Sequence, residues 1–224
     1  MQSKVKLTRR QIKEDKFTTF MLNAKSRFSE NWQFYVIGVV VVVLIAAAAS
    51  WYVSDQAAHK AEAEAKFARA VLDYQSGDSQ VALLGFDQLL NEYGSTDVAQ
   101  QATYLLGNIH LSNKNYEDAI HYFEIYLERY RDDLLNQAAA QAGIAAAKED
   151  LGNSAEAAAA FGKAAEMYPE GPLVADYEYG AVRNYLSVGD LESAKAHFDV
   201  IREKYADTDP GKCAIRLYSE KGHS

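Results

Sequence analysis

The chain has 224 residues and a formal net charge of −8, from 23 basic and 31 acidic residues. The charge is unevenly divided, because residues 1–31 hold eight basic and three acidic residues, whereas the remainder holds 15 basic and 28 acidic residues. The acidic body, with its net charge of −13, argues against a nucleic-acid-binding protein, since phosphate is bound by clustered Lys and Arg.

Residues 1–31 form a basic segment with a helical pattern. Thr8 and Gln11 have the spacing of a capping box, and apolar residues then recur every three or four positions: Ile12, Phe17, Phe20, Met21, Ala24 and Phe28. We predict a basic amphipathic segment on the cytoplasmic side. It could lie on anionic lipid, dock a cytosolic partner, or only set the topology of the segment that follows.

Residues 32–53 are predicted to form a transmembrane helix. The run from Phe34 to Val53 has no charged residue and Ser50 as its polar interruption, which matches the roughly 20 apolar residues that a spanning helix needs. Aromatic side chains, which prefer the headgroup layer, flank the run and are its predicted interface anchors: Trp32, Tyr35, Trp51 and Tyr52.

The same apolar run allows two alternatives to a permanent span. A core helix of a soluble protein is rarely so long and so uniformly apolar. A cleaved signal peptide is the stronger alternative, because the stretch AAAAS at residues 46–50 offers small residues for cleavage, although the basic segment before it is longer than such signals normally have. The excess of Lys and Arg before the run predicts a cytoplasmic N-terminus and a body on the other side of the membrane.

Residues 54–208 repeat themselves at intervals of 37 or 38 residues. Each copy has an alanine, a phenylalanine four positions later and a tyrosine seven positions after that: Ala82, Phe86 and Tyr93; Ala119, Phe123 and Tyr130; Ala157, Phe161 and Tyr168; Ala194, Phe198 and Tyr205. Turn residues precede each alanine, so each unit is predicted to be helix, turn, helix. Such units bury their apolar faces only by stacking.

The last segment, residues 209–224, is predicted to be a capping helix and tail. Asp209 followed by Pro210 is typical of a helix start. The segment has no partner helix, and we expect Ile215 and Leu217 among its buried residues.

The repeated residues resemble those of a known repeat family. From about Ala63 to Ala206 the chain resembles tetratricopeptide repeats (TPR), and the second copy carries the usual residues of that family at Leu106, Gly107, Tyr116, Ala119 and Phe123, with the expected proline of the third copy at Pro169. The resemblance implies an all-α chain: one N-terminal transmembrane helix, a TPR-like α-solenoid of about four helix pairs, and a C-terminal capping helix.

The order of a basic segment, one membrane span and a repeat domain is similar to that of the ancillary subunit of the Sec translocon. A weaker similarity is to the TPR domain of the cell-division coordinator. The resemblance implies a single-pass protein of the bacterial inner membrane with a periplasmic repeat domain. Its implied partners are membrane lipid and other proteins, namely the translocon, exported clients or an envelope complex. No nucleic acid and no small-molecule substrate is expected.

The same resemblance nominates a binding surface, because TPR proteins bind on the concave face lined by the first helix of each pair. The candidate groove residues are Phe67, Tyr104, Asn108, Tyr179 and Arg183. Packing between repeats is the alternative role for the aromatic ones. Ala139, Ala142 and Ala146 would give the third repeat a smooth floor. Family members that clamp a terminal carboxylate need a set of Lys and Asn residues across successive repeats. Of that set only Asn108 is present, so such a clamp is not predicted.

Catalysis, metal binding and cofactor binding are not predicted. The five histidines are scattered, and no phosphate loop, serine elbow or paired-carboxylate cleft stands out. Cys213 is the single cysteine, so no internal disulfide can form. Two functions remain: an anchored scaffold or chaperone-like factor that receives client chains, or a structural subunit of a secretion, division or motility complex.

Overall fold

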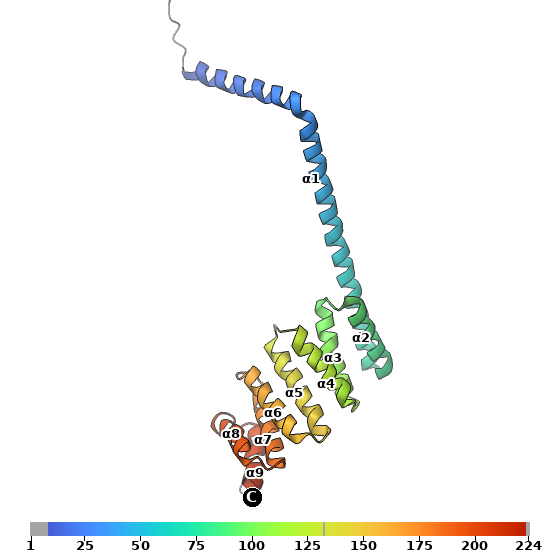
Figure 1. Cartoon of the computed structure of the whole chain (residues 1–224), viewed down its shortest axis with the longest axis vertical. Coiled ribbons are helices and arrows are strands. Elements are labelled where there is room, and N and C mark those ends of the chain that lie inside the picture. The colour runs from blue at the N-terminus through green and yellow to red at the C-terminus, as the bar shows by residue number, and fades with distance from the viewer. Residues whose placement is uncertain (1–8, 132, 223–224) are drawn as a thin grey trace, which may run out of the picture. The chain divides into compact units, whose positions relative to one another are not determined.

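The computed structural model describes residues 9–131 and 133–222, and among them the side chains of 19–21, 32–131 and 133–222. The described residues form helices and no strand (Figure 1). The helices are α1 (Arg9–Gln75), α2 (Ser79–Tyr93), α3 (Asp97–Ser112), α4 (Tyr116–Arg129), α5 (Leu134–Asp150), α6 (Ser154–Met167), α7 (Val174–Ser187), α8 (Leu191–Lys204) and α9 (Asp209–Lys221). The chain divides into two units, one ending at Ala58 and one starting at His59.

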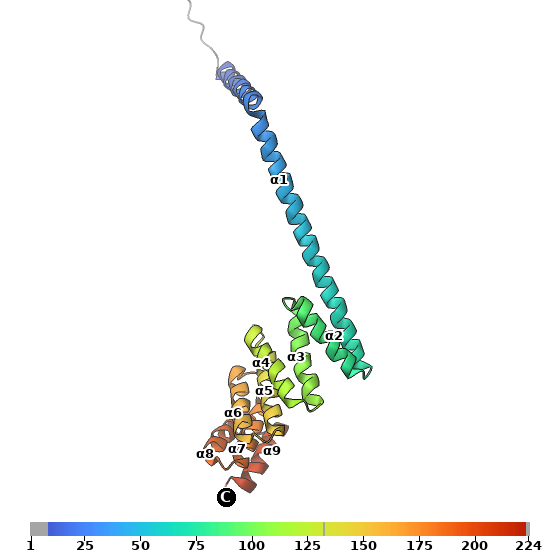
Figure 2. The same cartoon turned by 45° about the vertical axis from the view of Figure 1, so that its right-hand side comes forward.

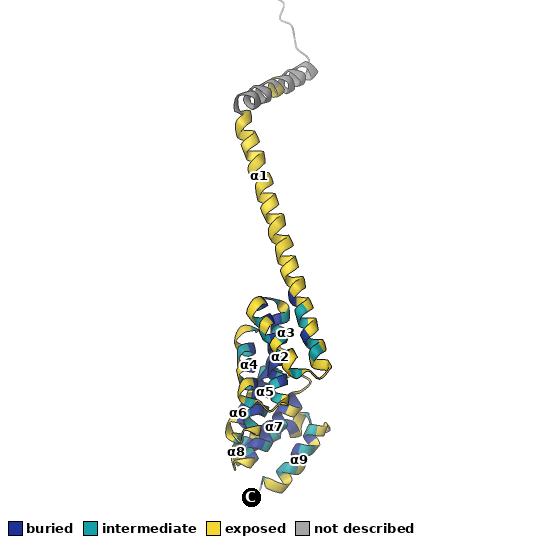
Figure 3. Cartoon of the chain, turned by 90° about the vertical axis from the view of Figure 1, so that its right-hand side faces the viewer, coloured by how far each residue is buried: buried dark blue, intermediate teal, exposed yellow. Residues whose placement is uncertain are grey.

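The first unit is the N-terminal part of α1. Its apolar run lies exposed along the whole length from Trp32 to Val53 (Figure 3). Within the described chain, one helical stretch, Trp32–Gln75, is long and apolar enough to cross a membrane by length and composition, with a mean hydropathy of 2.6 in its best window and none of that window buried. The predicted cap at Thr8 lies outside the described residues, as do most apolar side chains of the segment before the run.

The second unit is an α-solenoid, as predicted. The end of α1 pairs with α2, and the pairs α3/α4, α5/α6 and α7/α8 follow, each packed on the next (Figure 1; Figure 2). All four repeat alanines, Ala82, Ala119, Ala157 and Ala194, are fully buried. Small side chains there let the two helices of a pair approach, and the aromatic ring one turn later fills the space beside them.

Two of the four repeat phenylalanines, Phe123 and Phe161, pack against glycines. A Cβ added to Gly107 on α3 would lie 2.6 Å from the ring of Phe123, and one added to Gly143 on α5 would lie 2.4 Å from it. The ring is fully buried and therefore sits between the first helix of its own repeat and the first helix of the next. Phe161 makes the corresponding contact with Gly180 on α7, at 2.8 Å from the added Cβ.

The turn inside each pair has one residue in the left-handed region. Three of these residues are glycines: Gly77 (φ 92°), Gly152 (φ 83°) and Gly189 (φ 76°). The second repeat has Lys114 there, with φ 62°. A side chain in this region costs energy that glycine avoids, so the second turn is the strained member of the series.

Helix α9 caps the C-terminal end. It begins at Asp209, and the Thr208 hydroxyl accepts a hydrogen bond from the Gly211 amide at 3.1 Å. Its inner face packs on α7 and α8 through Gly211, Ala214, Leu217 and Tyr218. Leu217 is half-buried on this inner face, whereas Ile215 is 38% exposed and its expected burial is wrong, because the inner face of α9 follows residues 211, 214 and 218 and turns position 215 outward.

Candidate functional site

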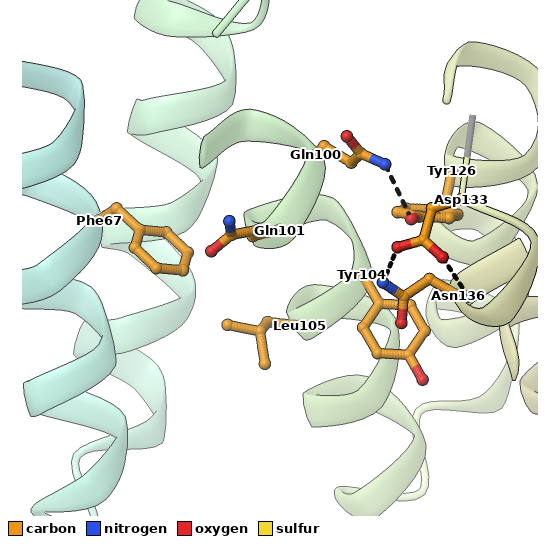
Figure 4. A pocket seen from close by; sticks show the side chains of 8 residues that line it. All are labelled: Phe67, Gln100, Gln101, Tyr104, Leu105, Tyr126, Asp133 and Asn136. Carbon is orange, nitrogen blue, oxygen red and sulfur yellow. Dashed lines mark hydrogen bonds between the residues drawn. The ribbon is translucent and has the colours of Figure 1, made fainter. Parts of the chain in front are cut away.

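A pocket of about 400 Å³ opens on the first helices of the solenoid. It lies among α1, α3, the C-terminal half of α4 and the start of α5 (Figure 4). Its lining residues are Phe67, Gln100, Gln101, Tyr104, Leu105, Tyr126, Asp133 and Asn136. In Figure 4, Phe67 stands on one side, Gln101 and Leu105 in the middle, and the remaining polar side chains on the other.

The aromatic side chains of the pocket rest on the aromatic core of the solenoid. The Phe67 ring lies 5.8 Å from that of Phe86, and the Tyr104 ring lies 5.9 Å from that of Phe123 and 5.5 Å from that of Tyr126. Tilted ring pairs at such distances are favourable. Phe67 and Tyr104 are only half-buried, so they are held firmly by the core while one face of each stays open to the pocket.

The polar end is built around the start of α5. Asp133 caps that helix, since its carboxylate accepts hydrogen bonds from the backbone amide of Asn136 at 3.1 Å and from the Asn136 side chain at 2.6 Å. The Gln100 amide donates to the Tyr126 hydroxyl at 3.0 Å. Burial raises the pKa of Tyr126, although its hydrogen bond with Gln100 lowers it in part. The hydroxyl is therefore neutral at physiological pH.

The structure brings two of the five candidate groove residues together, Phe67 and Tyr104. Asn108 donates to the backbone oxygen of Tyr104 at 3.0 Å, within its own helix. Arg183 forms an ion pair with Glu149 at 2.5 Å, and its guanidinium lies 5.4 Å from the centre of the Tyr179 ring. Tyr179 and Arg183 thus lie at a separate place on α7, and a binding role for Asn108, Tyr179 and Arg183 stays a prediction.

The three alanines expected to form a smooth floor in the third repeat are partly exposed. Ala139, Ala142 and Ala146 are half-buried on α5, and the last two also pack against a buried cluster that contains Phe161. A binding role for this floor of small side chains stays a prediction.

Sequence reasoning missed the polar half of the pocket. Asp133 follows a break and precedes a helical stretch, which is the signature of an N-cap and could have located it. Tyr126 and Gln100 could not be found in this way, because the contact between them depends on how α4 crosses α3.

Two of the five histidines, His110 and His197, lie beside acidic side chains at separate places. His110 stacks on Tyr122 with ring centres 5.2 Å apart and lies 3.6 Å from Asp118. His197 lies 2.6 Å from Glu178. Within residues 9–131 and 133–222, no group of three or more His, Cys, Asp or Glu side chains has the arrangement of a metal site.

Stacked helix pairs with a pocket on their first helices define an α-solenoid of the protein-interaction class. The family model described as a tetratricopeptide repeat-like domain matches residues 25–170, and the chain belongs to that family, whose members are generally non-catalytic scaffolds that bind proteins or peptides. The comparison with curated proteins returned no match.

Solved structures share the fold. The MamA RS-1 ArsTM double mutant has a TM-score of 0.53 at 22% sequence identity, covering 67% of this chain and 80% of that one. YrrB, described as a TPR protein with an unusual peptide-binding site, has a TM-score of 0.52 at 19% identity, covering 70% of this chain and 76% of that one. At these identities the likeness concerns the fold alone.

Proposed function

We propose that this protein is a membrane-anchored scaffold that binds segments of other polypeptides in the pocket beside Tyr104. The observation that carries the proposal is the pocket itself, which combines open aromatic faces with amide side chains on the first helices of the repeats. Apolar surfaces with a few placed polar groups are typical of binding sites. Amides of Gln and Asn can hydrogen-bond the backbone of an extended chain.

The exposed run of α1 supports the anchor. Side chains from Phe34 to Ile45 are 45% or more exposed wherever they are large and apolar, and apolar surface left in water costs about 25 cal/mol per Å². A bilayer removes that cost. The family match starts at residue 25 and so includes the run, which favours a retained anchor over a cleaved signal.

The proposed topology and location of the protein rest on the basic segment, residues 1–31, and on the resemblance to the ancillary Sec subunit. The proposal is a bacterial inner-membrane protein with a cytoplasmic N-terminus, a periplasmic repeat domain, and exported chains as clients. A reporter that is active only outside the cytoplasm, fused after Ser224, should be active. An inactive fusion would reverse the orientation and place the partners in the cytosol.

A structural subunit is the second candidate, and one observation favours it. The C-terminal end of the solenoid is covered by α9, whereas a groove of about 320 Å³ between α1 and α2 stays open. Val81 and Leu84 on that groove are 53% and 63% exposed. A permanent partner could cover this end.

Photo-crosslinking in cells separates the two functions. A crosslinking amino acid is placed at Gln101, which lines the pocket, at Leu84 in the open groove, or at Lys163 on α6, an exposed control position. Many transient products from position 101 and none from position 163 are expected for a client-binding scaffold. One stoichiometric product from position 84, with nothing from position 101, would reject the pocket and favour the structural subunit.

A further inference from the structure

The polar end of the pocket carries a negative charge that no described side chain balances. Asp133 is the single charged residue among those that line the pocket. Within the described residues its carboxylate has hydrogen bonds from Asn136 and no ion pair with a Lys or Arg. The ion pairs that α1 forms, Lys66 with Glu92 and Lys60 with Asp97, do not involve Asp133.

The same end also offers open hydrogen-bond acceptors. The Gln100 and Asn136 amides each donate an N–H, to Tyr126 and Asp133 respectively, and the carbonyl oxygen of each amide can accept hydrogen bonds from a ligand. The Asp133 carboxylate can accept further bonds beside the two that it has. A positively charged group that donates several hydrogen bonds therefore complements this end of the pocket.

The aromatic side chain next to these acceptors favours a guanidinium over an ammonium group as the bound cation. Tyr104 stands on the same side of the pocket as Asp133 and Asn136 (Figure 4). A guanidinium group is planar, donates five hydrogen bonds and stacks on aromatic rings, whereas an ammonium group is a strongly hydrated point charge. Leu105 and Phe67 lie beyond, where an apolar neighbour in the bound segment would find contact.

We propose that the pocket selects polypeptide segments in which an arginine stands next to an apolar residue. The guanidinium lies among Asp133, Asn136 and the ring of Tyr104, and the apolar side chain lies on Phe67 and Leu105. The net charge of −13 after residue 31 attracts the same segments over a longer range. This inference rests on the proposed function of the pocket and names its ligand class.

Fluorescence polarisation tests the selection with the full chain in phosphatidylcholine nanodiscs, and empty nanodiscs correct for lipid binding. The probe is a tetramethylrhodamine-labelled peptide, Gly-Ser-Leu-Arg-Phe-Ser-Gly, with a C-terminal amide. It is compared with versions that carry citrulline, the neutral isostere, or lysine in place of arginine. We expect the arginine peptide to bind about tenfold or more tightly than the citrulline peptide, because hydrogen bonds between charged partners are the strong ones.

Matched variants tie the preference to Asp133. Asn also caps helices well, so Asp133→Asn removes the charge and keeps the cap. Asp190→Asn makes the same change at the cap of α8, where the carboxylate accepts from the Ser193 amide at 3.0 Å. The ratio of arginine to citrulline affinity should fall to near one in Asp133→Asn and stay at its original value in Asp190→Asn.

The outcomes separate the inference from the function. Equal binding of the arginine and citrulline peptides, or tighter binding of the lysine peptide, would overturn the arginine assignment and leave the pocket as a peptide site. An unchanged ratio in Asp133→Asn would overturn it as well. Absence of binding by all three peptides, together with absence of crosslinks from position 101, would overturn both.

Discussion

Adding one methyl group at Gly143 tests how the repeats are packed. The Cβ of Gly143→Ala would lie 2.4, 2.6 and 2.9 Å from three atoms of the Phe123 ring. The ring is fully buried and cannot move away toward α3, because a Cβ at Gly107 would meet the same ring at 2.6 Å. The added methyl must therefore separate α5 from α4.

Two opposing terms set the size of the effect. Overpacking a filled core costs typically 1–3 kcal/mol, or about 3 kcal/mol when the obstructed ring has no free side. Alanine returns about 1 kcal/mol through its higher helix propensity. The net loss in the free energy of unfolding is about 2 kcal/mol, which for a domain of this size lowers the melting temperature by about 4–8 °C.

The assay is urea and thermal unfolding of the fragment 55–224, followed by circular dichroism at 222 nm. The double variant with Phe123→Leu should lose less than the sum of the two single variants, since a smaller side chain makes room for the methyl group. A Gly143→Ala variant as stable as the original fragment would refute the packing of Phe123 between two glycines.

Three further changes test the left-handed turns, the buried hydroxyl of Tyr177 and the independence of the repeat domain from the apolar run. Lys114→Gly should raise the free energy of unfolding by about 1 kcal/mol by relieving the left-handed turn, and Gly152→Ala should lower it; equal effects of the two would contradict the turn geometry. Burial raises the pKa of Tyr177 to about 12, so the folded state holds this proton more tightly and its contribution to stability falls as the pH rises from 10 to 12. Urea unfolding should therefore show a smaller alkaline loss for Tyr177→Phe, with no loss at pH 8, because the buried hydroxyl has no hydrogen-bond partner in the described chain. The fragment starting at Asp55 should be soluble and helical by circular dichroism, and an unfolded fragment would make the apolar run part of the fold.

The repeat pattern predicted the fold because it records packing directly. The spacing of Phe86, Phe123, Phe161 and Phe198 placed the second helices correctly, and the turn residues placed the breaks. The partners of those rings were not predicted, because Gly143 and Gly180 lie in helices of the following repeat, and only the stacking brings them onto Phe123 and Phe161.

The site was predicted less completely than the fold. Of the groove residues nominated by helical register, Phe67 and Tyr104 line one pocket, and their binding role stays a prediction. Register alone does not show which polar side chains are already used, and the structure pairs Arg183 with Glu149 and Asn108 with its own backbone. Asp133 belongs to a turn between repeats, so its place at the pocket depends on the angle between α3 and α5.

Hydrogen exchange of the full chain in nanodiscs, with and without the arginine peptide, tests whether other polypeptides bind in the pocket. Binding in the pocket should slow exchange in α3 around residues 100–105 and at the start of α5, while α8 and α9 keep their original rates. Slowing confined to α2, or to the outer helices α6 and α8, would contradict the pocket as the place where this protein binds other polypeptides.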